Sequence, residues 1–149
     1  MILSKKRDYI LDLIKTHDFM HSLSTFLVCP VEDPQRYGII TGRDAGKGLM
    51  YVETMIEKPS RPESNLAIMP VYVFDQSIFG SLEKTTPGKN NEIQLTDGIS
   101  KLLATNKNKV IAIKMNSADL FIDVGNPETY WNALKISYEE TYSYQERRN

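Results

Sequence analysis

The chain has 149 residues, of which 41% are hydrophobic and 25% charged, a composition typical of a folded globular protein and not of a disordered chain. With 18 Lys and Arg against 19 Asp and Glu, the net charge of -1 supplies no basic field and argues against nucleic acid as a partner. The single cysteine, Cys29, excludes an internal disulfide, and neither a membrane-spanning run nor a signal-peptide pattern occurs. We therefore expect one cytoplasmic domain over residues 1–149 without a membrane segment.

The first half of the chain predicts a helix followed by strands. Apolar residues recur at helical spacing over residues 5–18, with Ser4 as a candidate N-cap. Residues 24–31 form a short β-rich apolar run, typical of a strand buried on both faces. Residues 37–41 and 49–56 flank the segment GRDAGKG, whose glycines permit the positive φ angles of a tight reversal. This arrangement predicts a hairpin.

The second half predicts another strand, several helices and two short strands. Residues 66–74 form the strand, but Pro70 cannot donate a ladder hydrogen bond, so the strand should be bulged there or lie at a sheet edge. Apolar residues at helical spacing predict helices over 76–84 and 91–105. The remaining predicted elements are strands over 110–114 and 120–124, a helix starting near Asn126-Pro127-Glu128, and a polar tail over 139–149 that should fray.

The mixture of helices, strands and a hairpin predicts an α/β sheet domain. An α/β sheet that binds a nucleotide usually opens with a strand and a Gly-rich loop that holds a phosphate at the start of a helix. This sequence begins directly with a helix pattern. The predicted fold is therefore a mixed sheet flanked by helices, without the N-terminal nucleotide-binding portion.

The tripeptide Glu57-Lys58-Pro59 places an acid and a base at the end of an apolar strand. Because a residue before proline avoids the helical region, we expect Lys58 to be held in extended geometry. A functional interpretation is that Lys58 is presented to an anion such as a phosphate, with Glu57 available to hydroxyl groups. The alternative is a solvated strand end, and the tripeptide by itself favours that alternative.

A second candidate is Asp123 in the segment LFIDVG, which ends an apolar strand and precedes Gly125. Ligands bind at the carboxyl ends of strands in α/β sheets, and a carboxylate at this position suits Mg²⁺, which prefers oxygen ligands. An aspartate that caps the next helix or turn explains the pattern equally well. Both interpretations stay open on the sequence alone.

Other titratable residues give weaker signals. Glu92 and Asp97 are five residues apart, which does not place them on one helical face for acid–base work. His17 and His21 have i,i+4 spacing, but two ligands without a third make a poor metal site. We interpret both histidines as residues on a helix surface.

Four segments in order, VEDPQRYGII, MIEKPSRPESNLAIMPVYVF, NEIQLTDGISKLL and FIDVGNPETYWNALK, closely resemble the sugar-1-phosphate nucleotidyltransferases. The glucose-1-phosphate uridylyltransferase and thymidylyltransferase group is the most similar. The resemblance implies a Rossmann-like α/β domain in which a sugar-phosphate oxygen attacks the α-phosphorus of a nucleoside triphosphate. Pyrophosphate leaves, and Mg²⁺ offsets the charge.

The resemblance also implies roles for particular residues. Glu57 resembles the family acid that contacts the sugar hydroxyls, and Lys58 resembles the lysine that contacts the sugar phosphate. Gly38 matches a glycine whose backbone approaches the sugar ring, where a side chain would intrude. The remaining implied residues are Asp123 as one of two Mg²⁺ ligands, Asn65 and Ala67 in the sugar pocket, and Glu92 as a family acid without a defined role.

The sequence also departs from the family pattern. The Gly-rich loop, with its arginine and lysine for the triphosphate, and the base-recognition region have no counterpart in these residues. Met1 stands where the second metal aspartate would be, and Pro70 stands where many bacterial relatives have glycine. The chain thus resembles only the sugar-binding C-terminal half.

Two hypotheses follow from the resemblance. One is that the chain is the sugar-phosphate half of a nucleotidyltransferase and is inactive alone. The other is that it is a non-catalytic sugar-phosphate-binding or scaffold module. Missing strands would leave an exposed sheet edge, so we also expect association with another copy or with a missing N-terminal half.

Overall fold

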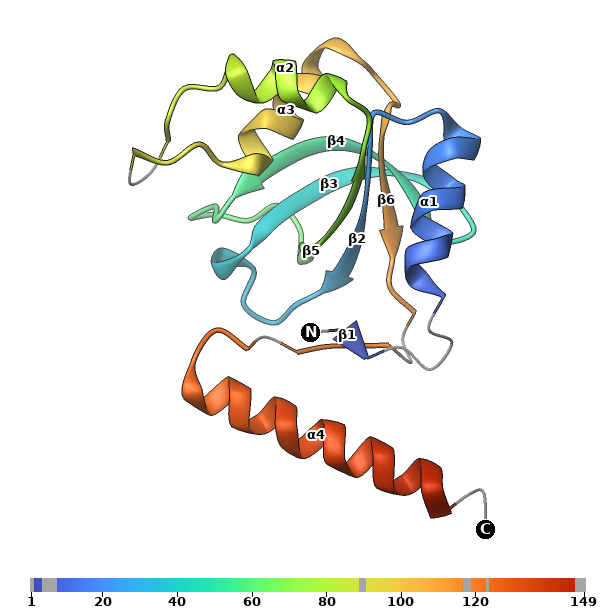
Figure 1. The fold of residues 1–149 in the computed structure, drawn as a ribbon. Coiled ribbons are helices and arrows are strands. Elements are labelled where there is room, and N and C mark those ends of the chain that lie inside the picture. Colours follow the sequence, from blue (N-terminus) through green and yellow to red (C-terminus); the bar gives the residue numbers. More distant parts are fainter. Residues whose placement is uncertain (1, 4–7, 89–90, 117–118, 123, 147–149) are drawn as a thin grey trace. The chain divides into compact units, whose positions relative to one another are not determined.

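A computed structural model describes residues 2–3, 8–88, 91–116, 119–122 and 124–146. The chain divides into two compact units (Figure 1). The large unit is Asp8–Asn116, and the small unit combines Met1–Arg7 with Ser117–Asn149. That the whole chain folds as a single domain stays a prediction.

The large unit is built on five strands in the spatial order β2-β5-β3-β4-β6 (Figure 1). Strands β2 and β6 are parallel and the other pairs are antiparallel, which confirms the predicted mixed α/β sheet. The order closes on itself through Ile39 opposite Ala67 in β3 and β5. The strand bounds are β2 Ser24–Pro30, β3 Gly38–Gly46, β4 Leu49–Glu57, β5 Leu66–Phe74 and β6 Val110–Lys114.

The sequence analysis predicted self-association because an exposed sheet edge was expected, and the closed order of the described strands in the large unit does not have that edge. Among the described strands of the large unit, each has a hydrogen-bonded neighbour on both sides in the order β2-β5-β3-β4-β6. These five strands therefore have no open edge of the kind that missing strands would leave. Association with another chain stays a prediction without that support.

Three helices cover the sheet of the large unit. Helix α1, Tyr9–Met20, contacts β2 and β5, whereas α3, Leu95–Thr105, lies on β4 and packs against α2, Ser77–Glu83. Helix α1 ends at Met20, two residues later than expected, and its C-cap His21 has a φ of 46° in the left-handed region. Helix α1 begins at Tyr9, with Asp8 at the N-cap position, so the prediction that Ser4 is the N-cap is wrong.

Helix α3 begins at Leu95, four residues later than the sequence pattern predicts. Gln94 is extended, with a ψ of 131°, and the backbone N–H of Gly88 donates to the carbonyl of Glu92 at 2.9 Å. The residues that the sequence pattern placed in the first turn of the helix therefore form a loop turn before α3. The buried residues Ile99 and Leu102 follow the predicted helical spacing.

Two irregularities shape the strands. The β2–β5 register shifts between Phe26 and Val28, opposite the segment that contains Pro70, which confirms the predicted bulge. The β3–β4 register shifts between Thr41 and Gly42, leaving Glu53 without a paired residue. The hairpin is longer than predicted, because its strands extend to a short turn at Lys47 and Gly48, where φ is positive.

The core lies between the sheet and the α2–α3 pair. All of β2 from Ser24 to Val28 is buried, as expected for a strand covered on both faces. Phe26 and Tyr72 are in aromatic contact, with ring centroids 5.9 Å apart. The fully buried members of the apolar cluster are Phe26, Val28, Ile40, Val110 and Ala112.

The small unit pairs β1, Ile2–Leu3, antiparallel with β7, Leu120–Phe121, and continues into α4, Pro127–Glu146. Asn126 and Thr129 cap α4 reciprocally: the Thr129 N–H donates to Asn126 Oδ1 at 2.9 Å, and the Asn126 N–H donates to Thr129 Oγ1 at 3.2 Å. This confirms the predicted helix start. The α4 backbone continues through the first part of the tail that was expected to fray.

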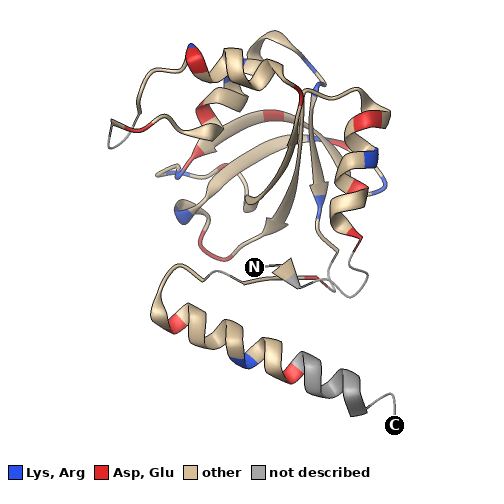
Figure 2. Cartoon of the chain, in the orientation of Figure 1, with Lys and Arg blue, Asp and Glu red and all other residues tan. Residues whose placement is uncertain are grey.

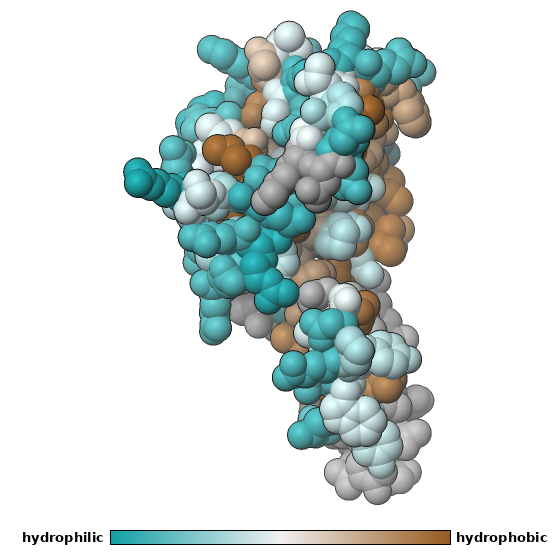
Figure 3. All heavy atoms as spheres, turned by 90° about the vertical axis from the view of Figure 1, so that its left-hand side faces the viewer, coloured by the Kyte–Doolittle hydropathy of each residue, from teal (hydrophilic) through white to brown (hydrophobic). Residues whose placement is uncertain are grey.

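Figure 2 shows positions of Lys and Arg interspersed with positions of Asp and Glu along the described chain, in agreement with the balanced composition. The face shown in Figure 3 is mainly hydrophilic, with separate apolar patches. No helix within the described ranges is both long enough and apolar enough to cross a bilayer.

Candidate sugar-phosphate site

Glu57 and Lys58 lie at the end of β4, opposite the start of β3. Glu57 pairs with Gly38 in the β3–β4 register, and the Lys58 N–H donates to the Tyr37 carbonyl at 3.1 Å. The Lys58 ammonium lies 3.5 Å from Glu57 Oε1. The lysine side chain is 55% exposed and the glutamate side chain 26% exposed, so the two charges occupy the rim of the large unit.

The expectation that Pro59 holds Lys58 extended is wrong. Lys58 has a φ of 43°, in the left-handed region that a non-glycine residue occupies at a cost of about 1–2 kcal/mol. Proline disfavours the right-handed helical region for the residue before it, and here the chain takes the left-handed region instead. The hydrogen bond to Tyr37 and the burial of Pro59 fix this turn, so Lys58 is presented from a strained turn at the strand end.

Thr96 positions the Glu57 carboxylate. Its hydroxyl donates to Glu57 Oε2 at 2.8 Å, from the first turn of α3. Thr96 is buried, and Ser100 one turn later donates to the Met55 carbonyl at 3.0 Å, so α3 lies along β4. The sequence analysis missed Thr96, although its place in NEIQLTD, within a resembling segment, was a usable signal.

Tyr72 on β5 is a second residue that the sequence analysis missed. Burial, and then the negative charge of Glu57, raise the pKa of the Tyr72 phenol to about 12. The phenol therefore stays protonated and neutral near the carboxylate. Its ring also packs between Phe26 and Phe74.

The raised pKa of Tyr72 predicts a pH dependence of stability. Above the ordinary pKa of 10.0, the unfolded chain loses the phenol proton whereas the folded chain keeps it, so stability falls as pH rises from 10.0 to about 12. Urea unfolding over this range should show a steeper fall for the wild type than for Tyr72→Phe. An equal fall of stability with pH in the two proteins would contradict the raised pKa of Tyr72.

Gly38 lies in close contact with the Glu57 carboxylate. A Cβ at Gly38 would lie 3.0 Å from both Glu57 Oε2 and Ile68 Cδ1. A side chain there would press on the carboxylate that Thr96 holds. The structure thus gives Gly38 a role beside Glu57, and its approach to a sugar ring stays a prediction.

Asn65 directly precedes β5, and Ala67 is the second residue of that strand, opposite Ile39 of β3. Asn65 is exposed, and its backbone carbonyl accepts from the Val31 N–H at 3.0 Å. Ala67 is fully buried between Cys29 and Ile39, so its methyl group lies in the interior. Contacts of these residues with a sugar stay predictions.

Of the two predicted carboxylates outside β4, only Glu92 lies among the described residues, and no described contact joins it to Glu57. Glu92 precedes α3, is exposed and accepts a long 3.5 Å hydrogen bond from Gln94. Asp123 lies outside the described residues. Within the described ranges, no three His, Cys, Asp or Glu side chains cluster as a metal site.

His17 is not a simple surface residue as predicted. Its Nδ1 lies 3.0 Å from Ser22 Oγ and 3.2 Å from Thr25 Oγ1, and the two hydroxyls lie 2.6 Å apart. Ser22 and Thr25 are buried, so this cluster fixes the end of α1 on β2. His21 instead caps α1 through its backbone, and the two rings form no shared site.

The fold and the sequence together define the class of this protein. Residues 5–140 match the nucleotidyl transferase family, and the chain belongs to that family. It is 39% identical to a UTP–glucose-1-phosphate uridylyltransferase of Pseudomonas aeruginosa over 112 residues, 74% of this chain and 39% of the relative. It is 42% identical to UTP–glucose-1-phosphate uridylyltransferase 1 of Streptococcus pyogenes serotype M1 over 114 residues, 72% of this chain and 37% of the relative.

A solved structure has the same fold. The crystal structure of a UDP-glucose pyrophosphorylase complexed with UDP-glucose superimposes with a TM-score of 0.83 at 28% identity. The match covers 93% of this chain and 53% of that one. The chain therefore spans about half of the solved relative and less of the curated ones.

Proposed function

We propose that this chain is the sugar-phosphate-binding part of a glucose-1-phosphate nucleotidyltransferase that uses UTP or dTTP. The observation that carries the proposal is the β4 end, where the Lys58 ammonium and the Glu57 carboxylate lie together and Thr96 fixes the carboxylate. The names of the relatives, which act on glucose 1-phosphate or contain UDP-glucose, agree with it. A cytoplasmic location is part of the same proposal.

The two charges have complementary roles in this proposal. Glu57 accepts hydrogen bonds from sugar hydroxyls, and Lys58 binds the sugar phosphate. The phosphate oxygen then attacks the α-phosphorus, a new P–O bond forms, and the bond to pyrophosphate breaks. Phosphoryl transfer depends mainly on positioning and charge stabilisation, which is what a fixed carboxylate beside an exposed ammonium supplies.

Magnesium is proposed on Asp123 alone, by resemblance to the family. A hard cation with oxygen ligands would offset phosphate charge. The described residues do not form a carboxylate cluster for it, so no step of the reaction is assigned to a metal held by them.

Lys58→Ala should weaken glucose 1-phosphate binding about 10- to 100-fold, because hydrogen bonds to charged groups contribute about 1.5–3 kcal/mol. Isothermal titration calorimetry of the 149-residue chain measures this. Lys47→Ala is the matched control, since Lys47 is exposed at the hairpin turn and also carries a positive φ.

Equal affinities for all three proteins would contradict the proposed role of Lys58. No heat for any of them would favour the scaffold alternative. The chain alone should release no pyrophosphate from UTP or dTTP with glucose 1-phosphate and Mg²⁺, because these residues contain no counterpart of the triphosphate loop. Turnover would contradict that part of the proposal.

A further inference from the structure

A groove of about 600 Å³ lies on the large unit, between the β3–β4 hairpin and the C-terminal end of α3. Met55 and Leu103 belong to its lining, whereas Glu57 and Lys58 do not. Thr96 contacts Glu57 from the first turn of α3, and Leu103 lies seven residues later, about 10 Å along the helix at 1.5 Å per residue. Ser100, one helical turn after Thr96, also belongs to the lining, so the groove begins beside the proposed sugar-phosphate site and extends away from it toward the end of α3.

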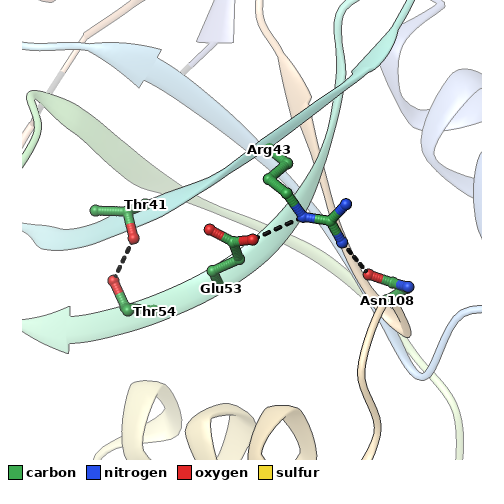
Figure 4. Close-up of polar contacts among 5 residues, drawn as sticks. All are labelled: Thr41, Arg43, Glu53, Thr54 and Asn108. Atoms are coloured by element: carbon green, nitrogen blue, oxygen red, sulfur yellow. Dashed lines mark hydrogen bonds and ion pairs between the residues drawn. The ribbon is translucent and has the colours of Figure 1, made fainter.

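The strand irregularity at Glu53 forms one wall of the groove. Because Glu53 has no partner in the β3–β4 register, Glu53 and Thr54 are both exposed beside the hairpin. Thr54 is held by a 2.6 Å hydrogen bond to Thr41 across the strands (Figure 4). The wall is thus fixed by the fold and not by long free side chains.

Arg43 connects the hairpin to the turn after α3. Its Nε donates to Glu53 Oε1 at 2.7 Å, and its Nη2 donates to Asn108 Oδ1 at 2.7 Å (Figure 4). The guanidinium also lies 5.7 Å from the centre of the Tyr51 ring. These contacts place the exposed Arg43 guanidinium at the mouth of the groove.

The charges of the groove do not balance. Its lining contains two cations, Arg43 and Lys107, and one carboxylate, Glu53, which is already bound to Arg43. Within the described part of the chain, Lys107 has no carboxylate in ion-pair distance. The groove therefore carries a net positive charge with an available ammonium group.

We propose that this groove binds a small organic anion, in which a ring or other apolar portion carries a phosphate or carboxylate. Leu103 and Ala104 supply accessible apolar surface above the buried Val52 and Met55, and Lys107 and Arg43 supply the positive rim. The volume lies inside the range of about 300–1,000 Å³ of small-molecule sites. Such a ligand would be bound in addition to the proposed sugar phosphate.

Amide NMR spectra of the full chain, titrated separately with phenyl phosphate, benzoate, inorganic phosphate and phenol, test this proposal. Phenyl phosphate or benzoate should shift the amides of Arg43, Thr54 and Lys107, and the difference between the two identifies the preferred anion. Inorganic phosphate and phenol should each bind at least fivefold more weakly, because inorganic phosphate lacks the apolar ring and phenol lacks the anionic group.

Lys107→Gln should weaken that binding about fivefold, the equivalent of about 1 kcal/mol for one solvated charge pair at 4 Å. Lys47→Gln removes the same charge at the hairpin turn and should leave the affinity unchanged. Lys58→Gln should also leave it unchanged, which separates this site from the proposed sugar-phosphate site. No shift at the groove at millimolar probe, or equal affinity in Lys107→Gln, would overturn the proposal.

Discussion

Alanine in place of Gly42 is expected to destabilise the chain by about 3 kcal/mol, near the upper end of the usual cost of overpacking. A Cβ at this position would overlap the backbone carbonyl of Tyr51 on the neighbouring strand. A flexible side chain could move aside, but a carbonyl in a paired strand cannot. Gly42 also begins the register shift opposite Glu53, so relief of the overlap would separate the two strands.

Gly80→Ala is the control for this substitution. Gly80 lies inside α2, with no atom within 4 Å of an added Cβ, and alanine is favoured over glycine in helices by about 0.5–1 kcal/mol. Urea unfolding followed by circular dichroism should therefore show opposite changes in the two variants. A Gly42→Ala protein as stable as the wild type would show that the hairpin register in this structure is wrong.

Thr96→Val is expected to weaken glucose 1-phosphate binding about tenfold. Valine has nearly the shape of threonine but cannot donate to Glu57 Oε2, and a lost hydrogen bond to a charged group costs about 1.5–3 kcal/mol. Without this bond the carboxylate rotates away from the position that the sugar hydroxyls require. Calorimetric titration of the variant measures the effect.

Thr96→Ser separates positioning from packing. Serine keeps the hydroxyl and loses only a methyl group, so it should restore most of the affinity that valine removes. If valine and serine variants bind alike, the hydroxyl of Thr96 does not position Glu57. Both affinities unchanged from the wild type would lead to the same conclusion.

Local sequence signals predicted much of the fold. The position of Pro70 predicted the β5 bulge, because proline lacks the N–H that a regular ladder needs. The Asn126-Pro127 start of α4 and the double-sided burial of β2 also follow from residue chemistry alone. Each of these features depends on neighbours along the chain, which is the information that a sequence pattern holds.

The features that were missed depend on contacts between distant segments. Thr96 reaches Glu57 across 39 residues, and no local pattern signals that pairing. The left-handed Lys58 depends on a hydrogen bond to Tyr37, and the polar environment of His17 depends on Thr25 in the next strand. The family resemblance predicted roles for Glu57 and Lys58, but the contacts that hold these two residues could be seen only in the fold.

The most direct test of the proposed function is to locate glucose 1-phosphate on the chain. In amide NMR spectra of the full chain, the largest shifts on titration should fall on Gly38, Glu57, Lys58 and Thr96, and Lys58→Ala should need about 10- to 100-fold more ligand to reach them. Shifts confined to the groove that contains Lys107, or none at millimolar ligand, would contradict a sugar-phosphate site at the end of β4.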